Sequence, residues 1–219
     1  MIKFENVSVT YPGGVEALKD LNLEIKDGDF IIIVGLSGAG KSTLLRTVNN
    51  LVKPSTGSVY LEGKNVTSAK KKELKKIRSQ IGMIFQTFNL VNRSTVLKNV
   101  LTGRLSNIST IRSILGLWPK DQKEMAFEAL NQVEILEKAY VRASNLSGGQ
   151  QQRVGIARAL SQKPKVMLAD EPVASLDPIT SRVVMSYLKK INTELGITTI
   201  VNLHFLDLAK EFGDRLIGL

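Results

Sequence analysis

Two glycine-containing segments of the chain could each bind an anion. Residues 35–43 read GLSGAGKST, and residues 146–150 read LSGGQ. Each segment leads into a helical pattern, and the free backbone N–H groups at a helix N-terminus attract negative charge. Two such segments in one chain require either two anions or one anion that both of them contact.

The first segment matches the phosphate-binding pattern G-x-x-x-x-G-K-[S/T]. It follows a buried-strand pattern and precedes a helical one, which is the context that this motif needs; a glycine-rich turn with a chance lysine is the disfavoured alternative. Backbone N–H groups are expected to wrap a pyrophosphate, with Lys41 on the β- and γ-phosphates and Ser42 on Mg²⁺. The expected nucleotide-binding residues are Gly35, Ser37, Gly38, Ala39, Gly40, Lys41, Ser42 and Thr43.

Two acids follow the apolar run KVMLA at the end of a second predicted strand. Asp170 is suitably placed to hold Mg²⁺ through water, and Glu171 to orient or deprotonate an attacking water. An Asp-Glu-Pro sequence alone could instead mark a helix start, where acids complement the helix dipole. Together with the phosphate-binding segment, these acids favour the catalytic interpretation.

The elements that must position these residues alternate between strands and helices. Residues 1–11 and 17–26 are predicted as alternating strands joined by the turn PGG. Residues 95–164 are mostly helical in pattern, with a loose stretch at 116–121. Further strands are predicted at 29–35, 57–63, 81–85, 165–170, 197–203 and 215–219, and helices at 41–51 and 180–195. Strands separated by helices indicate an α/β core with a largely parallel sheet.

Composition limits the possible classes of protein. The 219 residues are 43% hydrophobic, which is enough for a sizeable core. No apolar run approaches the ~20 residues of a membrane-spanning helix, and the first residues lack a signal peptide's apolar segment, so export is not expected. Cysteine is absent, which removes disulfides and thiolate metal sites and fits a reducing compartment. The net charge of +10 suits an anionic partner: a nucleotide, a nucleic acid or a lipid surface.

With LSGGQ added to the two other motifs, the chain resembles an ATP-binding cassette (ABC) ATPase, the motor subunit of ABC transporters, over essentially its whole length. The resemblance implies a P-loop NTPase core at residues 1–94 and 165–219, with an N-terminal antiparallel β subdomain, and an inserted helical subdomain at 95–164. It implies ATP and Mg²⁺ as cofactors. Its partners would be a second copy of the chain, in an ATP-dependent head-to-tail dimer, transmembrane permease subunits and, indirectly, a substrate-binding protein. The expected location is peripheral, on the cytoplasmic face of the cell membrane.

The same resemblance implies roles for residues outside the two glycine segments. Tyr11 would stack on adenine, although an ordinary strand-end tyrosine is the alternative. Gln86 would approach Mg²⁺ and the attacking water and relay contact to the membrane subunits. Asp177, in the sequence SLD, would lie at the subunit interface, unless it only caps a helix before Pro178. His204, the only histidine, would contact the γ-phosphate rather than serve as a polar turn residue.

In this family LSGGQ closes over the ATP held by the opposite subunit, so the resemblance implies one anion shared by two segments. A serine-capped helix is the alternative for Ser147. The residues expected to bind nucleotide there are Ser147, Gly148, Gly149 and Gln150, and those expected around Mg²⁺ are Ser42, Gln86 and Asp170.

Residues 88–105 and 198–219 resemble the ATP-binding subunits of bacterial importers for phosphonates or related phosphorus compounds, which usually continue past the last predicted strand. The rival function is a soluble ABC ATPase that acts on nucleic acid or ribosomes, for which the positive charge is the only support. The basic run at 69–78 is expected to be a solvated helix face, with anionic lipid or nucleic acid as the alternative contact. A regulator that binds nucleotide without hydrolysis is disfavoured by Glu171. We therefore expect no nucleic-acid partner.

Overall fold

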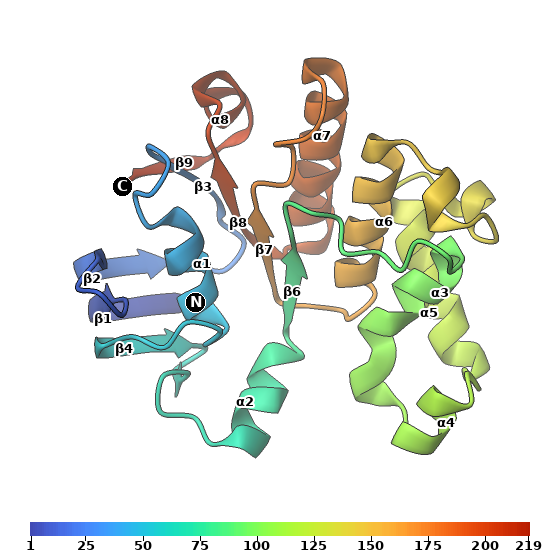
Figure 1. Cartoon of the computed structure of the whole chain (residues 1–219), viewed down its shortest axis with the longest axis horizontal. Coiled ribbons are helices and arrows are strands. Elements are labelled where there is room, and N and C mark those ends of the chain that lie inside the picture. Colours follow the sequence, from blue (N-terminus) through green and yellow to red (C-terminus); the bar gives the residue numbers. More distant parts are fainter.

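The computed structural model describes all 219 residues, which form two sheets and the helices around them (Figure 1). The larger sheet has five strands in the order β6-β7-β8-β3-β9, and every neighbouring pair is parallel. Its strands are β3 (Phe30–Val34), β6 (Ile81–Ile84), β7 (Val166–Asp170), β8 (Thr198–Leu203) and β9 (Arg215–Gly218). β7 and β8 are buried along their whole length, because helices cover both faces of a parallel sheet. The carboxyl ends of β3, β7 and β8 therefore meet at one edge.

The smaller sheet is antiparallel, with the order β2-β1-β4-β5. Its strands are β1 (Ile2–Thr10), β2 (Glu16–Ile25), β4 (Thr56–Leu61) and β5 (Lys64–Asn65). One face of β1 packs into a core that also contains residues of α1 (Lys41–Val48). The register of β1 shifts between Phe4 and Val7, where Asn6 has a positive φ of 48°. Such a bulge keeps Val7 and Val9 on the buried face.

Two helices link the sheets. α1 follows β3 after the loop at 35–40 and ends at Val48, so the predicted helix at 41–51 is three residues too long. The chain turns away at Asn50, whose φ of 53° is incompatible with a right-handed helix. The basic run forms α2 (Lys71–Arg78), in which only Ile77 is buried, as expected of a solvated helix face.

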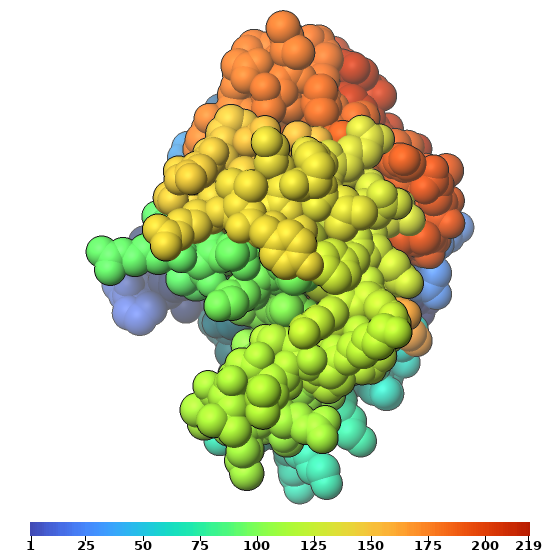
Figure 2. Space-filling model, turned by 90° about the vertical axis from the view of Figure 1, so that its right-hand side faces the viewer, coloured from blue at the N-terminus to red at the C-terminus, as the bar shows by residue number.

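A block of helices lies beside the larger sheet (Figure 1). It contains α3 (Val96–Leu101), η1 (Thr102–Asn107), α4 (Thr110–Ile114), α5 (Lys120–Gln132), η2 (Leu136–Lys138), η3 (Ala143–Asn145) and α6 (Gly148–Leu160). α3, α5 and α6 share one hydrophobic core with the sheet. In contrast, α4 buries none of its residues, and Figure 2 shows the segment near residue 110, in yellow-green, projecting from the lower part of the molecule. The helical block thus has one strongly exposed corner.

α7 (Pro178–Leu195) and α8 (Leu206–Phe212) complete the fold. α7 begins with proline at its first position and ends at Gly196, whose φ of 64° closes the helix. α8 is absent from the predicted elements, because seven residues are too few for a clear helical period. None of the helices combines enough length and apolar character to cross a bilayer.

Candidate functional site

A pocket of about 330 Å³ lies at the carboxyl edge of the larger sheet, beside the loop between β3 and α1. Most of its wall comes from the predicted phosphate-binding segment, and the rest comes from the turn between β1 and β2, the start of β2 and the residues that directly follow β7 and β8. The lining residues are Tyr11, Val15, Ala17, Ser37, Gly38, Gly40, Lys41, Ser42, Thr43, Glu171 and His204. Gly35 and Ala39 belong to the loop but do not line the pocket. Four segments distant in sequence therefore converge on one cavity.

Glycine is required at two points of this loop. Gly40 has a φ of 92°, and a Cβ atom there would lie 2.1 Å from the carbonyl oxygen of Ala17 in β2. Gly38 has a φ of 84° with open space around it. At both positions an L side chain would strain the backbone, and at Gly40 it would also collide with the smaller sheet. These glycines let the chain enter α1 with its first N–H groups facing the pocket.

Lys41 is almost completely buried at the floor of the pocket. Its Nζ donates hydrogen bonds of 2.9 Å to the carbonyl oxygens of Gly35 and Leu36, and it lies 3.5 Å from Nδ1 of His204. The ammonium is thereby held inside the loop with no carboxylate acceptor. A phosphate oxygen would give it the charged partner that a buried ammonium requires.

The buried carboxylate of Asp170 accepts hydrogen bonds from three other side chains. Its Oδ1 accepts from Ser42 Oγ at 2.7 Å and from Asn202 Nδ2 at 3.0 Å, and its Oδ2 accepts from Arg46 at 3.1 Å. A hydroxyl and a carboxylate oxygen are ligands that Mg²⁺ prefers, and Mg²⁺ commonly takes its other ligands from water and substrate phosphates. The residues present therefore fit a magnesium ion.

Glu171 and His204 meet across the ends of β7 and β8. Oε1 of Glu171 lies 2.5 Å from Nε2 of His204, whose other ring nitrogen faces Lys41. A neutral imidazole protonated on Nε2 satisfies both contacts, because it donates to the carboxylate and accepts from the ammonium. Glu171 also has a φ of 52°, a conformation that a glutamate adopts only when its surroundings impose it. A carboxylate, an imidazole and an ammonium thus line one side of the pocket.

Three other predicted site residues have different surroundings. Tyr11 is partly exposed at the mouth of the pocket, and its hydroxyl lies 3.0 Å from Thr43 Oγ1. Gln86 is exposed just after β6 and does not line the pocket. Asp177 caps α7 by accepting from the backbone N–H groups of Ile179 and Thr180, and hydrogen bonds from Thr180 hold the pKa of this carboxyl below its usual value. The helix-cap alternative therefore describes Asp177 in the single chain.

The LSGGQ segment lies away from the pocket. Ser147 caps α6 in a capping box: its hydroxyl accepts from the N–H of Gln150, and the Gln150 side chain accepts from the N–H of Ser147. None of residues 147–150 lines the pocket. Within one chain the structure does not bring the two glycine segments onto one anion.

Gly149 has a packing requirement that is independent of any ligand. A Cβ atom there would lie 2.3 Å from Cγ2 of Thr180 in α7. We expect Gly149→Ala to lower the free energy of unfolding by about 1–3 kcal/mol through overpacking, and Thr180→Ser to restore most of it by removing that methyl group. Gly155→Ala in the same helix is the control, because its Cβ would meet nothing closer than 3.9 Å. Urea titrations of the wild type, Gly149→Ala, Gly149→Ala/Thr180→Ser and Gly155→Ala measure these free energies of unfolding. Equal losses for Gly149→Ala with and without Thr180→Ser would contradict the explanation.

Two residues that hold Asp170 were missed in the sequence. Arg46 lies on the exposed side of α1, where an arginine is unremarkable, and Asn202 lies inside an apolar strand. Asn202 is completely buried and its Oδ1 has no partner. The signal in the sequence was that Asn202 is a polar residue inside the apolar run TTIVNL. Its partner, Asp170, is evident only from the structure, because the two residues pair between β7 and β8.

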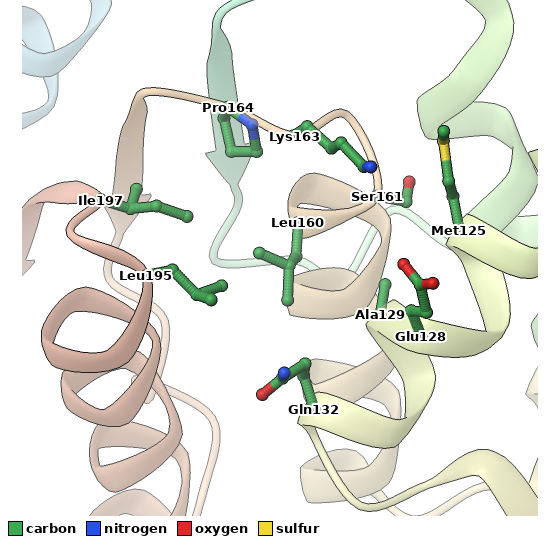
Figure 3. A pocket seen from close by; sticks show the side chains of 10 residues that line it. All are labelled: Met125, Glu128, Ala129, Gln132, Leu160, Ser161, Lys163, Pro164, Leu195 and Ile197. Carbon is green, nitrogen blue, oxygen red and sulfur yellow. The ribbon is translucent and has the colours of Figure 1, made fainter.

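A second pocket, of about 310 Å³, lies at the opposite edge of the larger sheet between α5, α6 and α7. Figure 3 shows Leu160 at its centre, with Leu195 and Ile197 on one side and Met125 and Glu128 on the other. It contains none of the predicted site residues, and half of its ten lining residues are hydrophobic. The charged groups converge in the first pocket, so we place the functional site there.

The parallel sheet, the glycine loop at the start of α1 and the acidic edge of β7 together define a P-loop NTPase fold. A family model described as ABC transporter matches residues 18–174. The chain belongs to the ABC transporter family.

Curated relatives agree with this assignment. The chain is 60% identical over 219 residues to the "Phosphonates import ATP-binding protein PhnC" of Bacillus thuringiensis subsp. konkukian (strain 97-27), covering 100% of this chain and 85% of that protein. It is 57% identical, with the same coverage, to "Phosphonates import ATP-binding protein PhnC 3" of Halalkalibacterium halodurans.

Solved structures share the fold. The dimeric post-hydrolysis state of the ATP-binding cassette MJ0796 bound to ADP and Pi has a TM-score of 0.86 and 40% identity, covering 100% of this chain and 94% of that one. The structure of cbiO1 from Clostridium perfringens, part of the ABC transporter complex cbiONQ, has a TM-score of 0.88 and 33% identity. The match covers 99% of this chain and 83% of that one. The predicted fold class is therefore confirmed.

Proposed function

We propose that this chain is the ATP-hydrolysing motor subunit of an ABC importer that takes up phosphonates or a related phosphorus compound. The observation that carries the ATPase assignment is the contact series in the pocket, from Lys41 through His204 to Glu171, at 3.5 and 2.5 Å. The cargo assignment rests on relatives named for phosphonate import. Those names also favour an importer over the nucleic-acid ATPase considered from the sequence.

The proposed reaction is attack of water on the γ-phosphorus of ATP. A bond forms from the water oxygen to this phosphorus, while its bond to the bridging oxygen of the β-phosphate breaks, which yields ADP and phosphate. Glu171 orients the water and accepts its proton, while His204 holds Glu171 and contacts the γ-phosphate. Lys41 balances charge on the β- and γ-phosphates, and Tyr11 stacks on the adenine.

Mg²⁺, when bound by Ser42 and Asp170 with Gln86 approaching it, would neutralise charge on the β- and γ-phosphate oxygens. Arg46 and Asn202 orient the Asp170 carboxylate for this role through their hydrogen bonds. Removal of either residue would leave Asp170 with fewer constraints on its position.

The assembly we propose is a head-to-tail dimer in which Ser147, the two following glycines and Gln150 of one copy close over the ATP of the other. Two features support this. Ser147 is exposed, and none of residues 147–150 lines the pocket of its own chain. In addition, one solved relative of 40% identity is described as dimeric. In the dimer, Asp177 would lie close to the subunit interface as well as capping α7. ATP would stabilise the closed dimer by mass action.

The domain division we propose is a nucleotide-binding core at residues 1–94 and 165–219 and a helical subdomain at 95–164. The helical subdomain exposes four large apolar side chains within seven residues: Ile111, Ile114, Leu115 and Leu117. An apolar cluster of this kind typically marks a protein contact, and transmembrane permease subunits are the partners we assign to it. The chain would then be peripheral on the cytoplasmic face of the membrane, with the substrate-binding protein as an indirect partner.

Reconstitution tests this function. The chain, its permease subunits and a substrate-binding protein are placed in lipid vesicles, and uptake of a radiolabelled phosphonate is measured with and without ATP on the side of the chain. We expect uptake that requires ATP and that disappears with Lys41→Ala. ATP hydrolysis stimulated by nucleic acid, without association with permease subunits, would contradict the importer assignment.

Gln86 separates coupling from chemistry in the same vesicles. Because Gln86 is exposed and outside the pocket, we expect Gln86→Ala to lower uptake by about tenfold and the ATPase rate of the isolated chain by less than about threefold. Gln162→Ala, which shortens a glutamine just after α6 and outside both pockets, is the control. Equal loss of uptake and isolated ATPase rate would instead indicate a purely catalytic glutamine.

A further inference from the structure

Arg158, near the end of α6, has a guanidinium that serves only backbone carbonyl groups. One terminal nitrogen donates to the carbonyl oxygen of Asn89 at 2.5 Å, and the other donates to that of Phe88 at 3.0 Å. No carboxylate pairs with it, and burial lowers the pKa of Arg158. A partly buried cation costs free energy, so its position needs a specific contribution from these two carbonyl groups.

The segment that Arg158 holds directly follows Gln86. Asn89 has a φ of 52°, so the chain bends sharply where the guanidinium binds it. The same segment also touches the other end of α6, because Cζ of Phe88 lies 3.7 Å from where a Cβ of Gly148 would be. Phe88 and Asn89 therefore contact α6 both near its LSGGQ end and at Arg158.

We infer that Arg158 is a positioning residue that fastens the Gln86 segment to α6, so that Gln86 and the LSGGQ end of the helix move together. This inference rests on the proposed function, in which Gln86 approaches the nucleotide and LSGGQ reaches the opposite subunit. A displacement of the Gln86 segment then moves Ser147 with it, because both are attached to one rigid helix rather than joined by a flexible loop. Without the two hydrogen bonds, the segment keeps its packing through Phe88 but loses its fixed backbone position.

The chain offers a matched control on the same helix. Arg153 is also partly buried and also donates to two backbone carbonyl groups, at 3.3 Å to Val133 and 3.0 Å to Glu134. These carbonyl groups belong to the residues that directly follow α5 and not to the Gln86 segment. Arg153 additionally contacts the ring and hydroxyl of Tyr187. Arg153→Met therefore removes at least as many contacts from α6 as Arg158→Met, but none of them reaches the Gln86 segment.

Hydrogen exchange and steady-state kinetics of the purified chain test the inference. We expect Arg158→Met to speed amide exchange in residues 85–92 and to lower kcat about tenfold, with the KM for ATP changed by less than about twofold. Arg158→Lys keeps one donor group and the charge, so its exchange rate in residues 85–92 and its kcat should lie between those of Arg158→Met and the wild type. Arg153→Met should leave exchange in residues 85–92 unchanged.

Unchanged exchange in residues 85–92 of Arg158→Met, or equal acceleration there in Arg153→Met, would overturn the inference. If Arg158→Met does not fold, Arg158→Lys and Arg153→Lys replace the methionine pair in the same comparison. A wild-type chain without ATPase activity would instead overturn the proposed function. The exchange comparison does not depend on activity, so it still tests the fastening of this segment.

Discussion

Glu171→Gln is expected to lower the turnover number for ATP by a factor of about 10² or more while nucleotide binding persists. Binding depends on the backbone N–H groups of the loop and on Lys41, whereas the carboxylate of Glu171 acts only as water attacks. Glutamine keeps the size of the side chain and a hydrogen bond to His204 but cannot accept the proton. Rapid-quench turnover and equilibrium binding of a fluorescent ATP analogue measure the two effects separately.

Two further variants complete this experiment. Glu211→Gln removes a carboxylate that pairs with Arg182 on the surface, and it should leave turnover unchanged. Lys41→Ala should weaken nucleotide binding itself, because it removes a charged partner of the phosphates. We also expect Glu171→Gln to accumulate as a dimer in ATP, because the closed state is no longer released by hydrolysis. Normal turnover in Glu171→Gln would remove this residue from the catalytic role.

Mixed dimers are expected to regain ATPase activity that both parent variants lack. Lys41→Ala breaks the phosphate-binding loop, and Ser147→Arg places a long charged side chain at the exposed start of α6. If each ATP is held between two copies, every site of either homodimer contains one defect. In the mixed dimer one site contains both defects and the other contains none. Activity should therefore rise from near zero to as much as one intact site per dimer.

The same experiment has a clear contrary outcome. If LSGGQ served the ATP of its own chain, both sites of the mixed dimer would be defective and mixing would restore nothing. Sequential purification on two different affinity tags proves that mixed dimers are present, and dimers of two differently tagged wild-type chains give the full rate. Absence of rescue in proven mixed dimers would contradict the shared anion, unless the two sites hydrolyse ATP only in strict cooperation.

Local chemistry made the phosphate-binding loop predictable from sequence. A strand rich in β-branched residues, glycines with positive φ and a lysine at the helix start specify the backbone over fewer than ten residues, and no distant contact is needed to recognise them. The parallel sheet was predictable for a similar reason, since each buried strand is a continuous apolar run. The end of α1 was not, because one positive φ at Asn50 terminates a helix whose apolar pattern continues.

The contacts between residues of different motifs could be identified only from the tertiary structure. Glu171 and His204 are 33 residues apart and meet only because β7 and β8 are neighbours in the sheet. The same pairing joins Asn202 to Asp170, a contact without any sequence motif. Strand order depends on how the helices pack on both faces, and a linear pattern of residue types contains no such information.

The sequence by itself determined which residues could do phosphate chemistry and which elements carry them, because those properties depend on near neighbours in the chain. Only the tertiary structure decided how these residues are used in the single chain: Gly149 is required by its contact with Thr180, and Arg158 binds the segment after Gln86. Both contacts join residues more than 30 positions apart. They form when packing of the hydrophobic core brings α6 against α7 and the end of β6, so no local pattern could have specified them.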